Sequence, residues 1–172
     1  MSPAPAETAS GSGDDAASAS TTGFVFAVGG ELYGVDLDEV VVAVGVAELL
    51  DVPWTPAHVL GVQRIQGGFE AIISLQRVLG IPEEGPGDAP PADDARRSRS
   101  RVLLLRAGDL RAGIVVDRIE DVAEVGALTP CPPGTRGQVA VYARGVGRWR
   151  DGFVCWLSAE RLLQGTALRA SL

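Results

Sequence analysis

Few side chains in this sequence could act on a substrate, and none has the spacing that catalysis requires. Enzymes need a nucleophile beside a base, a bound metal ion or a phosphate-binding loop. His58 is the only histidine, and no Gly-x-Ser-x-Gly motif accompanies it. We therefore expect His58 to lie at the surface or at the start of a helix, without a catalytic partner.

The two cysteines do not match a metal-binding motif either. Cys131 and Cys155 lack CxxC spacing, and with a single histidine they supply too few ligands for zinc. A disulfide between them is one alternative, and two separate thiols are the commoner arrangement in a cytosolic protein. The sequence predicts no metal site.

The glycine-rich segments match no phosphate-binding motif. Gly29-Gly30 precedes a β-prone run instead of a helix, and Gly145-Val146-Gly147 is followed by Arg150 where GxGxxG needs its third glycine. Glu120 and Asp121 are adjacent, so on a strand their side chains point to opposite faces. We predict a non-catalytic protein without cofactors that works by binding other proteins.

The composition is typical of a folded domain with an acidic surface. The chain has 172 residues, 46% of them hydrophobic and 22% charged, which is enough for a packed core. Its net charge of −7 argues against nucleic acid and anionic lipid as partners. We see no signal peptide and no run of about 18–20 apolar residues that would insert into a membrane, and we expect a cytoplasmic protein.

Two low-complexity segments limit the folded part. Residues 1–22 are rich in small and polar residues and are predicted to be a disordered tail. Residues 82–100 change from acidic to basic, contain four prolines, and are predicted to be a flexible loop. The folded domain is expected to span residues 23–172, with this loop between its two halves.

The apolar pattern predicts a domain made mainly of short strands. Gly29-Gly30 and Arg150-Asp151-Gly152 each join two β-prone runs, as hairpin turns do. Residues 74–80 are predicted to form a short helical turn that ends at Gly80, and Ser158 is the predicted N-cap of a C-terminal helix. Nine or ten strands are expected, including residues 40–46, 69–73, 101–106, 111–116, 117–125, 139–147 and 153–157. This pattern favours two small β-barrels.

The order of several short motifs resembles that of CheW-like domains. In this sequence they are residues 33–36, Val40, Pro56, Gly61-Val62 with Gly67, Leu75, residues 111–119 with Asp121-Val122, and residues 143–163 with the closing Glu160-Arg161-Leu162-Leu163. Residues 111–119 are similar to the family's GxxVDxV segment. The resemblance covers about residues 23–165.

The resemblance implies both a fold and a function. The fold would be all-β, with two intertwined five-stranded SH3-like β-barrels and a short C-terminal helix. The function would be that of an adapter in chemotaxis, which couples chemoreceptors to the CheA histidine kinase without catalysis. The cytoplasmic tip of a methyl-accepting receptor would bind in a groove between the barrels, and the kinase regulatory domain would bind through pseudo-symmetric barrel contacts. An alternative is a CheW-like module that has kept only one of these partners.

The resemblance also places the receptor-facing groove and shows where this sequence departs from the family. The candidate groove residues are Val40, Val42, Gly61, Arg64, Gln66 and Gly67. An arginine, a glutamate and an aspartate usual in the family are replaced here by Gln66, Val42 and Ser74. We hypothesise that the three charges were lost together, because an unpaired buried charge is costly. Arg64 would lie on the same side of a strand as Gln66 and could partly compensate.

Overall fold

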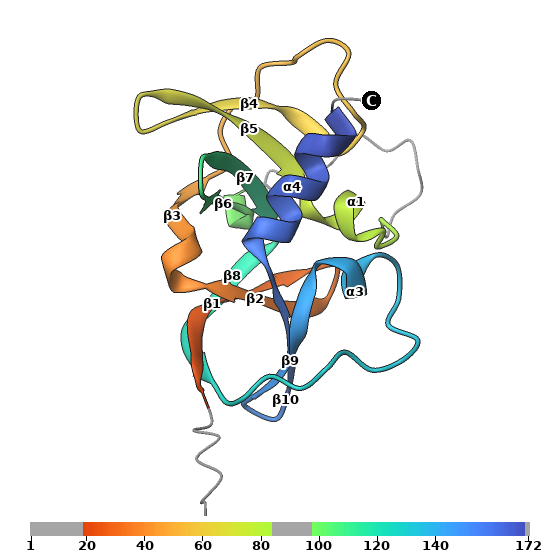
Figure 1. Cartoon of the computed structure of the whole chain (residues 1–172). Helices are drawn as coiled ribbons and strands as arrows, with labels where there is room; N and C mark the ends of the chain where they lie inside the picture. Colours follow the sequence, from red (N-terminus) through yellow and green to blue (C-terminus); the bar gives the residue numbers. More distant parts are fainter. Residues whose placement is uncertain (1–18, 84–97, 171–172) are drawn as a thin grey trace, which may run out of the picture.

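The computed structural model describes residues 19–83 and 98–170, and its strands form two five-stranded sheets (Figure 1). One sheet has the order β8-β1-β2-β10-β9 and the other β3-β6-β7-β5-β4. The strands are β1 (Thr21–Val28), β2 (Glu31–Asp36), β3 (Val40–Gly45), β4 (Val59–Ile65), β5 (Gly68–Ser74), β6 (Arg101–Ala107), β7 (Leu110–Val116), β8 (Arg118–Val125), β9 (Ala143–Trp149) and β10 (Gly152–Leu157). The helices are η1 (Leu37–Glu39), α1 (Leu75–Leu79), α3 (Val139–Tyr142) and α4 (Ala159–Ala170).

Each sheet closes into a barrel because the chain beyond one edge strand reaches the opposite edge strand. In the upper barrel of Figure 1, Leu50 forms a β-bridge with Val62 of β4. In the lower barrel, Thr129 forms the corresponding bridge with Val146 of β9. The predicted all-β fold of two five-stranded barrels is thereby confirmed.

The barrels are intertwined because each contains strands from both halves of the chain. The lower barrel takes β1 and β2 from the first half and β8, β9 and β10 from the second. The upper barrel takes β3, β4 and β5 from the first half and β6 and β7 from the second. Strands of different halves meet in parallel where β2 pairs with β10 and β5 pairs with β7. The two halves are therefore related as an internal repeat.

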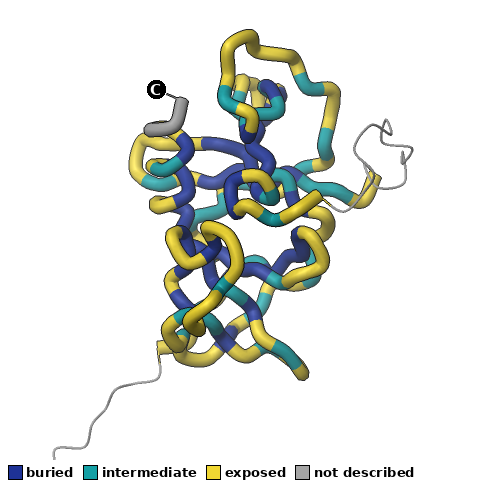
Figure 2. Tube along the Cα trace, turned by 90° about the vertical axis from the view of Figure 1, so that its right-hand side faces the viewer, coloured by how far each residue is buried: buried dark blue, intermediate teal, exposed yellow. Residues whose placement is uncertain are grey.

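Three hydrophobic clusters hold this arrangement together. Small clusters fill the two barrels, one around Val25 and Trp156 and the other around Ile72 and Leu104. The largest cluster lies between the barrels and contains side chains from both sheets and from α1, α3 and α4. Figure 2 shows the buried residues along the strands and exposed residues in the connections. Since the largest core is shared, neither barrel is an independent domain.

Local sequence signals explain most element boundaries. Gly29 and Gly30 both have positive φ, as the predicted hairpin turn requires. The Ser74 hydroxyl accepts a hydrogen bond from the Arg77 amide, and Gly80 ends α1 in the left-handed conformation. The Ser158 hydroxyl accepts from the Arg161 amide (3.2 Å) and caps α4. These predictions are confirmed.

One predicted strand is wrong at its start. Residues 139–147 were expected to be extended throughout, but Val139–Tyr142 form the short helix α3 and β9 begins at Ala143. Helical spacing places Val139 and Tyr142 on one side, where both are buried in the shared core. Tertiary packing here overrides the β-propensity of the valines.

The predicted tail and loop lie mostly outside the described residues. Of the segment 1–22, residues 1–18 fall outside, and β1 begins at Thr21, before the expected boundary. Of the loop 82–100, residues 84–97 fall outside, and β6 begins at Arg101 as expected.

Glycines in the lower barrel make room for a tryptophan. A Cβ on Gly34 would lie 2.4 Å from the Trp156 ring, and a Cβ on Gly23 would lie 2.7 Å from it. Trp156 is fully buried, and its indole N–H donates to an Asp36 carboxylate oxygen at 2.6 Å. The ring therefore fills the barrel only because both positions lack a side chain.

We expect Gly34→Ala to destabilise the protein by about 3 kcal/mol, because the new methyl group overlaps a ring that cannot move without disturbing the barrel. Gly45→Ala is the matched control, since a Cβ there has no atom within 4 Å. Urea unfolding of both variants measures the difference. Equal stability of the two variants would contradict the packing argument.

Candidate functional site

The six predicted groove residues all lie in the upper barrel, but they occupy three separate places. Val40 and Val42 are on the edge strand β3. Gly61 and Arg64 are on β4, and Gln66 and Gly67 form the turn between β4 and β5. The structure therefore does not bring all six into one surface.

The predicted residues of β3 point inward, and their neighbours point outward. Val40 packs against the shared core and Val42 against the core of the upper barrel. Val41 and Ala43 are exposed. The pairing with β6 shifts between Val40 and Val42, so Val41 is the extra residue of a β-bulge. The outward side of β3 is thus carried by residues that sequence analysis did not select.

Gly61 has a structural role that accounts for its type. Its φ is +141°, and a Cβ would lie 2.6 Å from the carbonyl oxygen of Leu50, at the bridge that closes the barrel. The neighbouring Gln63 is buried, and its amide donates to the Gly45 carbonyl (3.0 Å) and accepts from the Ala47 amide (3.1 Å). Gly61 and Gln63 together close the upper barrel.

The expected relation between Arg64 and Gln66 is wrong. Arg64 pairs with Phe69 and Ile65 with Gly68, so Gln66 and Gly67 are the two residues of a hairpin turn. Gln66 has a φ of +50° and Gly67 of +86°, as the two central residues of a type I′ turn do. Gln66 is therefore not on the strand that carries Arg64, and the two side chains do not share a strand face.

The serine at position 74 is explained by its place at the start of a helix. It replaces the family's aspartate at the N-cap of α1, and serine and aspartate are both good caps. Gln66 is an exposed turn residue, so an arginine at this position would lie in solvent and would need no buried partner charge. The hypothesis that three charges were lost together is not needed to explain these two positions.

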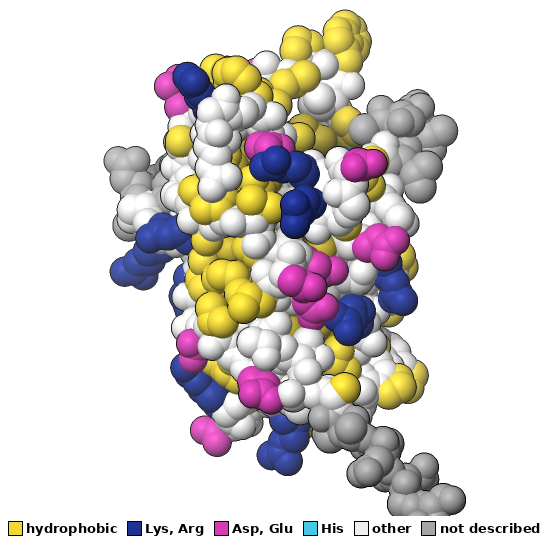
Figure 3. All heavy atoms as spheres, turned by 60° about the vertical axis from the view of Figure 1, so that its left-hand side comes forward, with side chains coloured by type: hydrophobic (Ala, Val, Ile, Leu, Met, Phe, Trp, Pro, Cys, Tyr) yellow, Lys and Arg dark blue, Asp and Glu magenta, His cyan; other side chains and the backbone are white. Residues whose placement is uncertain are grey.

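Three further exposed apolar side chains lie on η1 and on one edge strand of each barrel. The short helix η1 contacts β1 of the lower barrel and β6 of the upper barrel, and its Leu37 is 44% exposed. Val41 of β3 and Val122 of β8 are also exposed, and both belong to edge strands. Figure 3 turns the β3 side of the molecule forward and shows apolar side chains gathered on that face. We call Leu37, Val41 and Val122 the seam surface.

A second apolar feature is repeated on both barrels. Phe69 follows the β4–β5 turn and Phe153 follows the β9–β10 turn, and they are 64% and 67% exposed. Gln66 and Arg150 are the first residues of two-residue turns, with φ of +50° and +51°, so the two hairpins occupy equivalent places. Their turns differ at the second residue, because Gly67 has a positive φ and Asp151 does not. Sequence analysis missed this pair, although the repeated Gly-Phe after each turn was visible.

The third exposed apolar feature is a strained tryptophan. Trp54 lies in the β3–β4 loop (residues 46–58), is fully exposed and has a φ of +64°. The second half has a matching turn in which Gly134 has a φ of +86°. Thr55 and Thr135 close the two turns through hydrogen bonds to the carbonyls of Val52 (3.0 Å) and Pro132 (2.6 Å). Trp54 thus occupies a position that favours glycine and buries nothing in return.

Charged groups surround the start of α4. Asp36 pairs with Arg144 of β9, and an oxygen of Glu39 accepts a hydrogen bond from the Ala159 amide at 3.4 Å. Burial raises the pKa of the Glu39 carboxyl, and the nearby Asp36 adds to the increase, whereas the Ala159 amide and Arg144 oppose it. Glu39 is therefore less acidic than an exposed glutamate.

His58 is not a surface residue as predicted. It is buried, with an exposed fraction of 8%, and its carbonyl accepts a hydrogen bond from the Ser74 amide at 2.8 Å. It lies at the end of the β3–β4 loop, which packs back onto β5. In the described segments no three potential ligands gather around a metal position. No helix in those segments is long and apolar enough to cross a membrane.

Comparison with known proteins finds a family model and relatives of similar sequence. A family model described as CheW-like domain matches residues 22–167. The chemotaxis protein CheW of Helicobacter pylori is 26% identical over 140 residues, covering 81% of this chain and 79% of that protein. The chemotaxis protein CheW of Treponema pallidum is 26% identical over 146 residues, covering 84% of this chain and 82% of that protein.

A solved structure shows the same fold. The scaffolding protein TtCheW from Thermoanaerobacter tengcongensis aligns with a TM-score of 0.67 and 23% identity, over 80% of this chain and 84% of that chain. The two-barrel arrangement described above is therefore shared with a known scaffold.

We expect Trp54→Gly to stabilise the protein by about 1 kcal/mol, because it relieves the positive φ and removes no buried contact. Gly134→Ala is the reciprocal control at the matching turn and should destabilise by a similar amount. Thermal unfolding measures both. A loss of stability in Trp54→Gly would show that the ring makes contacts that offset its strain.

We expect Glu39→Gln to change how stability depends on pH. The folded pKa of Glu39 is raised above the ordinary 4.5, so the wild type loses stability as the pH rises through that folded value. The glutamine variant lacks this loss and should be more stable at pH 7 by less than about 1 kcal/mol, with the difference vanishing near pH 4. Urea unfolding at several pH values measures it, with Asp38→Asn at an exposed neighbour as control. A difference that grows toward low pH would contradict the assignment.

Proposed function

This chain belongs to the CheW-like domain family, and from that membership we propose a chemotaxis scaffold that couples chemoreceptors to a CheA-type histidine kinase. The comparisons favour this coupling function over a module that has kept only one partner. The proposed scaffold acts without catalysis and in the cytoplasm.

The observation that carries the proposal is the presence of distinct exposed apolar surfaces on one rigid core. Phe69 and Phe153 extend from equivalent hairpins of different barrels. The seam surface has one side chain on η1, which contacts both barrels, and one on an edge strand of each barrel. Exposed aromatic side chains are the usual anchors of protein interfaces. A coupling protein needs at least two surfaces that can be occupied at once, and this arrangement supplies them.

We assign the kinase regulatory domain to the hairpins and the receptor tip to the seam surface. The equivalence of the two hairpins supports pseudo-symmetric contacts with the kinase regulatory domain. The seam surface carries small and medium apolar side chains on two edge strands and a short helix, which suits the apolar face of a helical partner. This proposed receptor surface, with Leu37, Val41 and Val122 as its contact residues, replaces the six groove residues predicted from the sequence.

The proposal is tested by calorimetry with the full chain, the regulatory domain of its CheA and a cytoplasmic receptor fragment. Phe69→Ala and Phe153→Ala should each weaken kinase binding at least about tenfold and leave receptor binding unchanged. Val122→Glu should weaken receptor binding and leave kinase binding unchanged. Leu110→Ala, an exposed apolar side chain outside both surfaces, is the control for loss of apolar area.

Gln66→Arg tests the departure from the family separately. The equivalent turn position already holds Arg150, so the variant should fold normally. A gain in receptor affinity would show that the turn also contacts the receptor, in addition to the seam surface. Failure of the wild type to bind either partner would reject the coupling function, and equal weakening of both partners by every variant would reject the assigned surfaces.

A further inference from the structure

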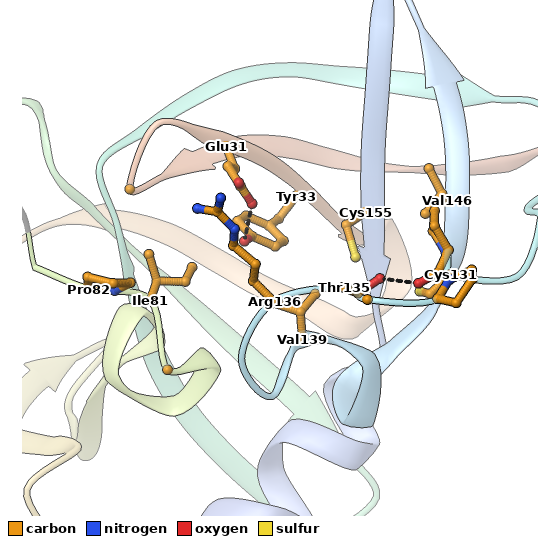
Figure 4. Close-up of a pocket in the computed structure, with 15 residues that line it drawn as sticks. Glu31, Tyr33, Ile81, Pro82, Cys131, Thr135, Arg136, Val139, Val146 and Cys155 are labelled. Atoms are coloured by element: carbon orange, nitrogen blue, oxygen red, sulfur yellow. Dashed lines mark hydrogen bonds between the residues drawn. The ribbon is translucent and has the colours of Figure 1, made fainter.

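The fold brings the two cysteines to one wall of a cavity. Cys131 lies in the β8–α3 loop (residues 126–138) and Cys155 in the middle of β10. Both line a cavity of about 560 Å³ next to Tyr33 and Arg136 (Figure 4). Both side chains are half-buried and pack against the shared core, and neither is in a disulfide. Burial raises the pKa of the Cys155 thiol, and the nearby Cys131 adds to the increase.

The loop that carries Cys131 is fixed on both sides of the cysteine. Before it, Thr129 and Val146 exchange backbone hydrogen bonds of 2.9 and 2.7 Å, and Val146 is the cross-strand partner of Cys155. After it, the Gln138 amide donates to the Leu79 carbonyl at 2.9 Å. The loop therefore holds Cys131 against the lower barrel, next to β9 and the cavity that Cys155 also lines, instead of extending it into solvent.

We infer that Cys131 and Cys155 form a reversible intramolecular disulfide when a peroxide oxidises the protein, which makes this pair a redox-sensitive modification site. The half-buried thiols face a cavity that small oxidants can enter, and each thiol finds the other as its nearest reaction partner. This inference is independent of the proposed function, because it needs no bound receptor or kinase.

The chemistry is balanced with hydrogen peroxide as the oxidant. The sulfur of Cys131 attacks one peroxide oxygen, which breaks the O–O bond and gives a sulfenic acid and one water molecule. The sulfur of Cys155 then attacks the sulfenic sulfur, the S–O bond breaks, and the departing hydroxide takes the Cys155 proton and leaves as a second water. Burial and the neighbouring thiol raise the pKa of Cys155 to about 12, so it remains protonated until this second step. Two thiols are oxidised and one peroxide is reduced.

The disulfide would tie the β8–α3 loop to the lower barrel. The loop forms one side of the cavity, and Tyr33, Glu31 and the β1–β2 turn form another. Cross-linking Cys131 to β10 restricts opening of the loop, so amide exchange in residues 127–136 should slow at least about tenfold on oxidation.

The test uses the reduced full-length protein treated with hydrogen peroxide and followed by thiol titration and mass spectrometry. We expect both thiols to disappear together, the mass to fall by two hydrogen atoms, and a Cys131–Cys155 peptide to appear that dithiothreitol removes. Cys131→Ser and Cys155→Ser should show neither the linked peptide nor the slower amide exchange. Circular dichroism checks that both serine variants are folded.

Three results would overturn the inference. They are a wild type that keeps both thiols, one that gives only sulfinic or sulfonic acid, and one whose cysteines link different molecules. The Cys155→Ser variant separates the first step from the second, because its Cys131 should still be trapped as a sulfenic acid by dimedone. Absence of that adduct together with absence of the wild-type disulfide would show that the cavity does not admit the oxidant.

Discussion

Two short parallel strand pairings make the two barrels one structure. β2 pairs with β10 through Tyr33–Cys155 and Gly34–Trp156, and β5 pairs with β7 through three residue pairs. Each pairing joins strands from different halves of the chain, so neither barrel can close until both halves are present. The shared core between the barrels forms as a consequence, and α4 packs on it, whereas η1 contacts β1 and β6. A barrel built from one half of the chain alone would lack two or three of its five strands.

The two parallel strand pairings are packed by different residues in the two barrels. At the parallel pairing, a glycine faces a large residue of the strand from the other half: Gly34 faces Trp156, and Gly113 faces Ile72. The larger ring in the lower barrel needs a second small neighbour, which is Gly23. The smaller Ile72 leaves room for Val102 at the equivalent place in the upper barrel. Total volume is thus kept while the individual residues differ, as close packing requires.

Sequence analysis succeeded where the structural signal is local and failed where it is not. The Gly29-Gly30 turn, the end of α1 at Gly80 and the Ser158 cap follow from the preferences of single residues. The exposed side of β3 could not be predicted, because valine and alanine fill the strand and no period of two is visible. The turn at Gln66 was missed because glutamine rarely adopts positive φ. The burial of His58 depends on how a long loop packs on β5, which no local pattern encodes.

The internal repeat explains why exposed positions can differ between the halves while the fold stays the same. The parallel pairings and the barrel-closing bridges are symmetric, and they need the glycines Gly61 and Gly145 at equivalent places. Outside these positions the two halves differ. Arg150 in the second half corresponds to Gln66 in the first, and Gly134 corresponds to the strained Trp54. A residue that is strained and exposed costs stability and stabilises nothing within the chain, so its role is to be sought in contacts with other molecules. The divergence allows one symmetric core to present unlike surfaces, which is the property that a protein coupling two different partners requires.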